Sequence, residues 1–185
     1  VETAKRMIDA SIEAGCNAMK WQKRTVNVVY TPEELSRQRE SPFGQTNGDL
    51  KRGLEFSLDE YQELDTYCKA HEFTWFASAW DEASVDFINE FDPPCWKIAS
   101  ACLTDDNLLR YHRLQSDKPI ILSTGMSTWR QIDHAIDVLG KDGLVLMHCV
   151  ATYPAKGEQL NLRAIPAMQR RYGLPVGYSG HELGL

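Results

Sequence analysis

Short apolar runs alternate with amphipathic segments along most of the chain, and this alternation limits the possible folds more than any other feature of the sequence. Strands are predicted over residues 17–22, 73–77, 95–99, 119–122, 144–149 and 175–178. Helices are predicted over residues 2–14, 81–91, 108–115, 128–139 and 162–172, with a further helix capped by Ser57 and Glu60. We expect the strands to be apolar on both faces, as in a parallel sheet covered by helices. Strict β–α alternation leaves an open doubly wound sheet or a (β/α)8 barrel.

The residues that follow the strands decide between these two architectures. A doubly wound sheet usually carries a glycine-rich phosphate turn, and neither G-x-G-x-x-G nor G-x-x-x-x-G-K-[ST] occurs in the chain. A barrel predicts polar, reactive side chains at the carboxyl ends of its strands, and this chain has them. The predicted fold class is therefore α/β, a TIM (β/α)8 barrel. Because 185 residues fall short of the roughly 250 typical of that fold, we expect one incomplete barrel domain of about six strands over residues 1–185.

Charge and cysteine content exclude several classes of protein. Twenty basic and 26 acidic residues give a net charge of −6, which argues against a nucleic-acid binder that must neutralise phosphates. No apolar run approaches the roughly 18 residues that span a bilayer, so no membrane partner is expected. The five cysteines form no C-x-x-C pair. We interpret them as reduced thiols in a cytoplasmic protein.

The strand ends supply the candidate site residues, which a barrel would bring to one mouth. They are Lys20, Gln22, Ser78, Lys97, Ser100, Ser123, Thr124, His148, Tyr153, Ser179 and His181. Two lysines among hydroxyls predict a site for a small, phosphate-bearing polyanion. Lys97 lies between Trp96 and Ile98, so we expect it to point into the barrel or its mouth, where an anion offsets the cost of burying it. The alternative is a lysine that extends from an edge strand into solvent.

Other strand-end residues keep two interpretations each. The turn at Ser123, Thr124 and Gly125 offers hydroxyls and amides to an anion, but it is also a good helix entry. His181 is a candidate metal ligand or general base, or else a structural histidine. His148 ends an apolar strand, where a hydrogen-bonded core histidine is at least as common as a histidine of a functional site. The three remaining histidines are predicted to be solvated: His71, His112 and His134.

Residues 24–53 show little periodicity over a length that exceeds ordinary loops. We therefore expect a long functional loop. Its Tyr30 and Phe43 either line the mouth of the barrel or hold the loop in place.

Eight segments together resemble the sialic acid synthases, also called N-acetylneuraminate synthases, which use phosphoenolpyruvate. In family order they are KWQK (20–23), FGQTNGDLKRGLEFS (43–57), WDEASVDF (80–87), KIASA (97–101), KPIILSTGM (118–126), HCVATYP (148–154), NL (161–162) and VGYSGHELG (176–184). Each segment alone is a weak signal, whereas the ordered set is specific. The resemblance implies a TIM barrel that condenses phosphoenolpyruvate with N-acetylmannosamine or its 6-phosphate, releasing phosphate by C–O cleavage.

The resemblance also implies roles for individual residues. Contacts to phosphoenolpyruvate are expected from Lys20, Ser78, Lys97, Ser100, Ser123 and Ser179, with Thr124 beside them. Gln22 and Tyr153 are expected to contact the amino sugar. His181 is expected to be one of two histidines that hold a divalent metal, Mn²⁺ or else Mg²⁺, which polarises the aldehyde. Lys20, Lys97 and His181 are thus the expected catalytic residues.

The chain departs from the family pattern at its ends and at two positions. Cys102 and Ala151 stand where the family commonly has an acidic residue and Ser or Asn, which puts two polar contacts in doubt. The family's second metal histidine lies on a later strand. We expect the first and last strands and a small C-terminal antifreeze-like domain to be absent, the segment alone to be inactive, and the full-length protein to be a homodimer.

Three alternatives remain. Legionaminate and pseudaminate synthases are related enzymes that use the same phosphoenolpyruvate site and a different amino sugar. A decayed barrel that binds sugar or a partner without chemistry is disfavoured because Lys20, Lys97 and the serines are all present. A metal-dependent lyase or isomerase would not need two lysines placed for a phosphate. Fold alone decides none of these.

Overall fold

The computed structural model describes residues 1–183, so Gly184, the last residue of the motif at 176–184, lies outside the described residues. The chain divides into two compact units, Val1–Pro93 and the part from Pro94 onward. The five cysteines are free thiols, as predicted. Within residues 1–183 no helix has both the length and the apolar character that crossing a membrane requires.

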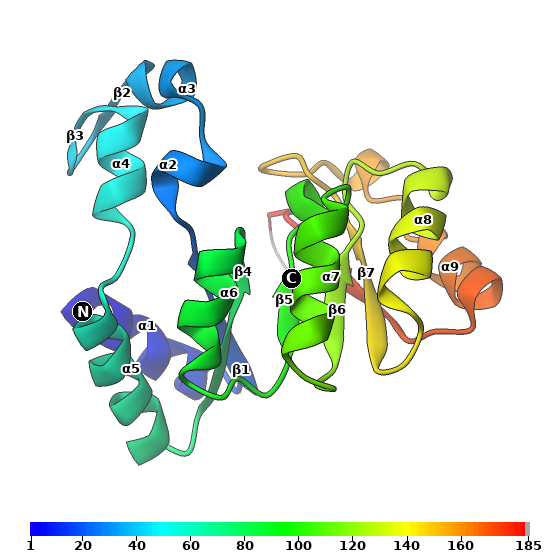
Figure 1. Ribbon diagram of the computed structural model, residues 1–185, viewed down its shortest axis with the longest axis horizontal. Coiled ribbons are helices and arrows are strands. Elements are labelled where there is room, and N and C mark those ends of the chain that lie inside the picture. Colours follow the sequence, from blue (N-terminus) through cyan, green and yellow to red (C-terminus); the bar gives the residue numbers. More distant parts are fainter. Residues whose placement is uncertain (184–185) are drawn as a thin grey trace. The chain divides into compact units, whose positions relative to one another are not determined.

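The first unit is built around two parallel strands (Figure 1). Its regular elements are α1 (Glu2–Glu13), β1 (Ala18–Lys23), α5 (Leu58–Ala70), β4 (Thr74–Ala79) and α6 (Glu82–Asn89). The side chain of Ser57 accepts a hydrogen bond from the Glu60 amide, and the Glu60 carboxylate accepts one from the Ser57 amide. The predicted capping box at the start of α5 is therefore confirmed. An aromatic cluster fills the space between β4 and its helices, with the Tyr61 ring 5.2 Å from Phe87 and 5.7 Å from Trp75.

Residues 24–53 were predicted to be one long loop, and the structure instead divides them into short regular elements. They form α2 (Val26–Val29), α3 (Pro32–Ser36), α4 (Asn47–Gly53) and an antiparallel hairpin of β2 (Gln38–Ser41) and β3 (Gly44–Thr46). Capping boxes start α3 at Thr31 and α4 at Thr46. Elements of three to seven residues are too short to show helical or strand periodicity, which is why the sequence pattern missed them.

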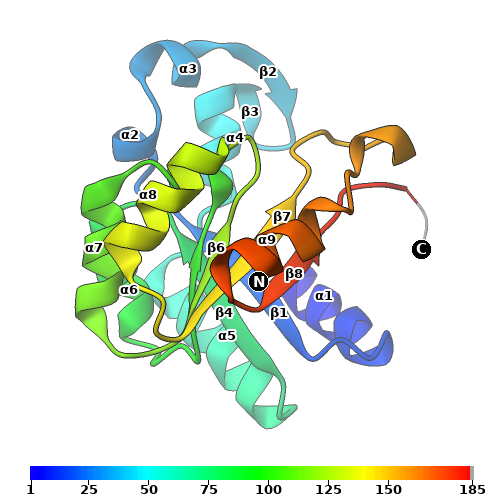
Figure 2. The ribbon, with the colours of Figure 1, turned by 90° about the vertical axis from the view of Figure 1, so that its right-hand side faces the viewer.

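The second unit contains four parallel strands in the order β5-β6-β7-β8. Its elements are β5 (Trp96–Ile98), a 3-10 helix (Ser100–Cys102), α7 (Asp106–Gln115), β6 (Ile120–Ser123), α8 (Trp129–Leu139), β7 (Leu144–Cys149), a 3-10 helix (Gly157–Gln159), α9 (Ala164–Tyr172) and β8 (Val176–Ser179). Figures 1 and 2 show α7 and α8 side by side. All six predicted strands and their helices are present with ends shifted by a few residues.

Burial follows the prediction in β4, β5 and β6 and departs from it at β1 and at β8, where every residue is only half-buried. Trp96, Ile98, Ile120 and Leu122 are fully buried. In β1, by contrast, no residue is fully buried, and Lys20 and Gln22 are exposed. A strand with two long polar side chains on one face is not apolar on both faces, so that expectation was wrong for β1.

The structure also corrects the prediction for His112, whose side chain is fully buried rather than solvated. Its ring lies 5.6 Å from that of Trp96, and its Nδ1 donates to the Leu108 carbonyl over 2.9 Å. Its Nε2 is buried without a hydrogen-bond partner among the described residues. This desolvation lowers the pKa of His112 to about 4. His71 and His134 are exposed, as predicted.

Candidate active site

The first unit places three predicted site residues on one face of its strand pair. Side chains alternate along a strand, so Lys20 and Gln22 lie on the face opposite Trp21 and Lys23. The latter face packs against the helical side, since Lys23 Nζ donates to the Phe56 carbonyl over 2.9 Å. Ser78 is buried on β4 and pairs in register with Gln22. The structure therefore brings Gln22 and Ser78 together.

Lys20 carries its ammonium on this same face. Its side chain is exposed, yet the surrounding protein lowers the pKa of the ammonium through desolvation. An ammonium that has lost part of its hydration gains more from a bound anion than a fully hydrated one does. Lys20 is thus chemically suited to hold an anionic group.

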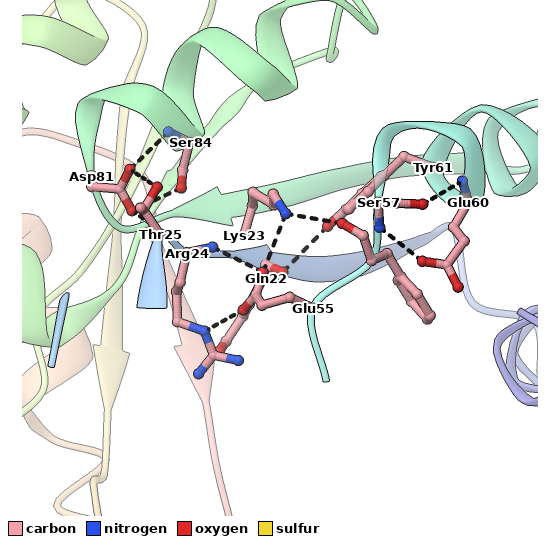
Figure 3. A network of polar contacts seen from close by, with 11 residues as sticks. Gln22, Lys23, Arg24, Thr25, Glu55, Ser57, Glu60, Tyr61, Asp81 and Ser84 are labelled. Atoms are coloured by element: carbon pink, nitrogen blue, oxygen red, sulfur yellow. Dashed lines mark hydrogen bonds and ion pairs between the residues drawn. The ribbon is translucent and has the colours of Figure 1, made fainter. Parts of the chain in front are cut away.

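A polar network that the sequence analysis missed fixes both ends of residues 24–53 (Figure 3). Asp81 is buried and accepts hydrogen bonds from the amide and hydroxyl of Thr25 and from the amide and hydroxyl of Ser84. Glu55 accepts from Arg24 Nε over 2.8 Å and lies 3.5 Å from Lys23 Nζ. These bonds hold the start of the segment, next to β1, against Asp81 and against Glu55, which lies shortly before α5.

The second unit gathers its site residues on the inner face of β5 to β8. The register places Lys97 and Ser123 on one face, continued by Cys149 and its register partner Ser179. Lys97 is buried, and its ammonium donates to the Ser123 hydroxyl and to the Ile98 carbonyl. Lys97 therefore does not extend from an edge strand into solvent, which was the alternative to the predicted orientation.

The turn after β6 brings Ser100 next to this row. The Gly125 amide donates to the Ser100 hydroxyl over 3.0 Å. A Cβ at Gly125 would lie 2.9 Å from Ser100 Oγ and 3.2 Å from Cys149 Cβ, so only glycine allows this approach. Thr124 is buried, and its hydroxyl donates to the Met147 carbonyl over 2.9 Å, which leaves only oxygen lone pairs for a ligand. Cys102 is buried in the 3-10 helix that begins at Ser100.

His181 and Tyr153 come together after β8 and β7. Their ring centroids are 4.1 Å apart, and the Tyr153 side chain is largely exposed. His181 Nδ1 contacts the Val150 carbonyl, an acceptor, so Nδ1 carries the proton. With Nδ1 held by this carbonyl, Nε2 is the ring nitrogen left for a metal, as in metal-ligating histidines whose other nitrogen donates to a carbonyl.

A complete metal site is not present among residues 1–183, where no group of three or more His, Cys, Asp or Glu side chains is placed to hold an ion. His181 therefore fits as one ligand, and the described residues do not complete the set.

His148 is separated from the site residues by the strand alternation. It lies on the opposite face of β7 from Cys149, stacked 6.0 Å from Tyr178, and its Nε2 donates to the Leu160 carbonyl over 2.8 Å. The interpretation of His148 as a satisfied structural histidine is the one that this geometry supports.

Three comparisons place the chain among known proteins. Residues 7–185 match the NeuB family. The N-acetylneuraminate-9-phosphate synthase of Drosophila melanogaster is 36% identical over 100% of this chain and 51% of its own length. The N,N'-diacetyllegionaminic acid synthase of Legionella pneumophila is 31% identical over 100% of this chain and 54% of its own length. The chain thus spans about half the length of these relatives.

The fold comparison agrees. An N-acetylneuraminic acid (sialic acid) synthetase from Leptospira borgpetersenii, solved with citrate, matches 98% of this chain and 60% of its own with a TM-score of 0.85 at 26% identity. The fold class is therefore the predicted one, an α/β partial TIM barrel. The chain belongs to the NeuB family, whose named relatives are sialic and other nonulosonic acid synthases.

Proposed function

We propose that the natural protein containing this chain condenses phosphoenolpyruvate with N-acetylmannosamine, or its 6-phosphate, to form N-acetylneuraminate or its 9-phosphate. The observation that carries the proposal is the buried Lys97 ammonium, which donates to the Ser123 hydroxyl on the inner face of the second unit's strands. A buried cation that already donates to a hydroxyl is a ready binding site for a phosphate or carboxylate.

The reaction joins C3 of phosphoenolpyruvate to the aldehyde carbon of the open-chain sugar. Water adds at C2, and the bond between C2 and the bridging oxygen breaks, so that inorganic phosphate leaves. In this scheme Lys97, Ser100, Ser123 and Ser179 hold the phosphate and carboxylate of phosphoenolpyruvate. Fixed donors of this kind stabilise the charge that moves onto phosphate in the transition state.

The first unit supplies the other contacts. Lys20 holds an anionic group of phosphoenolpyruvate, with Ser78 beside it, and Gln22 donates to the amino sugar. Tyr153, beside His181, is the second proposed sugar contact. These roles follow the family resemblance and are supported by the common face of Lys20, Gln22 and Ser78.

His181 is the proposed ligand for a divalent metal, Mn²⁺ or Mg²⁺, through its Nε2. The metal supplies Lewis-acid polarisation of the aldehyde oxygen when bound. A histidine whose Nδ1 is held by a carbonyl is oriented before any metal arrives, which favours binding. A homodimer and a cytoplasmic location remain predictions, as does inactivity of the 185-residue segment.

A legionaminate or pseudaminate synthase is the second candidate function. It is supported by the 31% identity to the N,N'-diacetyllegionaminic acid synthase, which is close to the 36% identity to the N-acetylneuraminate-9-phosphate synthase. Both reactions use the same phosphoenolpyruvate chemistry and differ in the sugar.

The test incubates the natural protein with Mn²⁺, phosphoenolpyruvate and a panel of amino sugars, followed by mass spectrometry for a nine-carbon ulosonic acid. The panel contains N-acetylmannosamine, its 6-phosphate and the diacetamido-dideoxy hexoses. Product from N-acetylmannosamine or its phosphate supports the first function, and product from a diacetamido sugar alone supports the second. Absence of product from every sugar, with manganese bound, would overturn both and favour a barrel that binds without catalysis.

A further inference from the structure

A hollow of about 440 Å³ lies within the segment that follows β1, in the first unit. Two apolar residues, Pro32 and Leu35, form part of its wall. The polar residues that line it are Asn27, Tyr30, Ser36, Thr46 and Arg52. We call it the Arg52 hollow. Its lining combines one guanidinium with three hydroxyl groups and one amide, and this set contains no carboxylate.

The guanidinium of Arg52 is placed in the hollow by two neighbours. Asn27 Oδ1 accepts from Arg52 Nη1 over 3.4 Å, at the long end of a hydrogen bond. A Cβ at Gly48 would lie only 2.6 Å from Arg52 Nη2, so the absence of a side chain at this buried glycine makes room for the guanidinium. Arg52 itself is exposed and therefore accessible to a ligand.

Two further basic side chains approach Tyr30, which lines the hollow. Lys51 Nζ lies 5.0 Å from the centre of the Tyr30 ring, and Arg24 donates to the Tyr30 hydroxyl over 3.0 Å. The neighbouring carboxylate of Asp49 accepts hydrogen bonds from the amides of Gln45 and Thr46 at the start of α4. Asp49 is thus engaged as the cap of α4, and its hydrogen bonds with Thr46, helped by the nearby Arg52 charge, hold the pKa of its carboxyl below the usual value.

We infer that the Arg52 hollow binds a phosphate monoester, the 6-phosphate of the amino sugar. A planar guanidinium with the Tyr30 and Thr46 hydroxyls around it matches the oxygens of a phosphate group, which accept paired N–H bonds. Condensation with a three-carbon unit turns C6 of the hexosamine into C9 of the product, and a 9-phosphate is the product named for the Drosophila relative. The segment leaves β1 immediately after Lys23, next to the proposed sugar contact Gln22. This inference rests on the proposed function.

The experiment measures kcat/KM of the natural protein for N-acetylmannosamine 6-phosphate and for N-acetylmannosamine, at saturating phosphoenolpyruvate and Mn²⁺. The variants are Arg52→Gln, Arg52→Lys and Lys51→Gln, with Arg37→Gln as a control. Arg37 is an exposed arginine of the same segment that does not line the hollow. We expect Arg52→Gln to lower kcat/KM for the phosphorylated sugar about 10- to 100-fold, mainly through KM, with less than a twofold change for the unphosphorylated sugar.

Arg52→Lys keeps the charge but loses the fork, so an intermediate loss is expected, and Arg37→Gln should match the wild type. Equal losses of kcat/KM for both sugars, or no loss for either, would overturn the inference about the Arg52 hollow. Neither outcome would contradict the proposed synthase function. A wild type that makes no product from either sugar refutes the proposed function for these sugars instead.

A second measurement separates the substrate phosphate from a free ligand. Inorganic phosphate is titrated into wild-type and Arg52→Gln protein while turnover of N-acetylmannosamine 6-phosphate is followed at saturating phosphoenolpyruvate. Under the inference, free phosphate competes with the sugar phosphate, so it raises KM for that sugar in the wild type and has less effect in Arg52→Gln. Inhibition that disappears in Arg52→Gln but is not competitive with the phosphorylated sugar would show that the hollow serves a separate anion, and the substrate assignment would be wrong.

Discussion

At the scale of single residues, the proposed anion site depends most on the contact between Lys97 and Ser123. A buried ammonium is costly, and this one is offset in the absence of a ligand by a hydroxyl and a carbonyl. A bound phosphate or carboxylate would add an anionic acceptor beside the hydroxyl and the carbonyl that this ammonium contacts. This is the physical reason to assign anion binding to Lys97 rather than a purely structural role.

Replacing Lys97 by methionine should therefore damage binding and leave folding intact. We expect Lys97→Met to lower kcat/KM for phosphoenolpyruvate about 100-fold, because hydrogen bonds from a charged donor contribute roughly 1.5–3 kcal/mol. The thermal midpoint should be unchanged or higher, since a desolvated charge is removed. The comparison uses steady-state kinetics beside Lys69→Met, an exposed lysine of α5 that should behave as wild type. A much less stable Lys97→Met protein would contradict the anion-binding role.

The buried ring of His112 is expected to make the free energy of unfolding fall as the pH is lowered. Its pKa is about 4 in the folded chain and about 6.5 when unfolded, so the unfolded state binds the extra proton between these pH values. The penalty is absent above pH 6.5, grows as the pH falls, and reaches about 2 kcal/mol near pH 5. Denaturant unfolding at pH 7 and pH 5 measures it.

The His112→Gln variant separates this titration from others. It carries no titrating ring, so the drop in stability between pH 7 and pH 5 should shrink by about 2 kcal/mol relative to wild type. His71→Gln, at an exposed position, should leave the drop unchanged. Equal pH dependence in all three proteins would show that His112 does not titrate in this range.

At the scale of elements, the turn after β6 depends on the absence of a side chain at one position. We expect Gly125→Ala to raise KM for phosphoenolpyruvate about tenfold or more, because the added carbon meets Ser100 Oγ at 2.9 Å and Cys149 Cβ at 3.2 Å. Gly157→Ala is the matched control, since nothing lies within 4 Å of a Cβ there. Titration of phosphoenolpyruvate in both variants decides the matter, and equal KM values would remove Gly125 from the site.

The regular strands and helices were predictable from short-range pattern, and residues 24–53 were not. The six strands and the Ser57 capping box follow from apolar runs and local hydrogen bonding, which the sequence displays directly. The short helices and hairpin after β1 are held by side-chain contacts such as Asp81 with Thr25, which join residues 56 positions apart. No local periodicity encodes such contacts.

At the scale of the whole molecule, metal dependence tests the proposed synthase directly. Prolonged chelation of the natural protein should abolish product formation, and Mn²⁺ should restore it. His181→Ala should lower bound manganese, measured by elemental mass spectrometry, and lower activity at least 100-fold. His71→Ala should retain both. Full manganese content in His181→Ala would remove this histidine from the proposed ligand set, whatever its activity.

The sequence by itself determined the fold class, the family resemblance and the residue types at the strand ends, because these depend on local pattern and chain order. The tertiary structure decided which of those residues meet: Lys97 with Ser123, Ser100 with Gly125, and His181 with Tyr153. It also decided that His112 is buried and that Thr124 bonds to Met147. Contacts between strands depend on the strand register and on which face of the sheet the helices cover. Both are set only when the whole sheet packs.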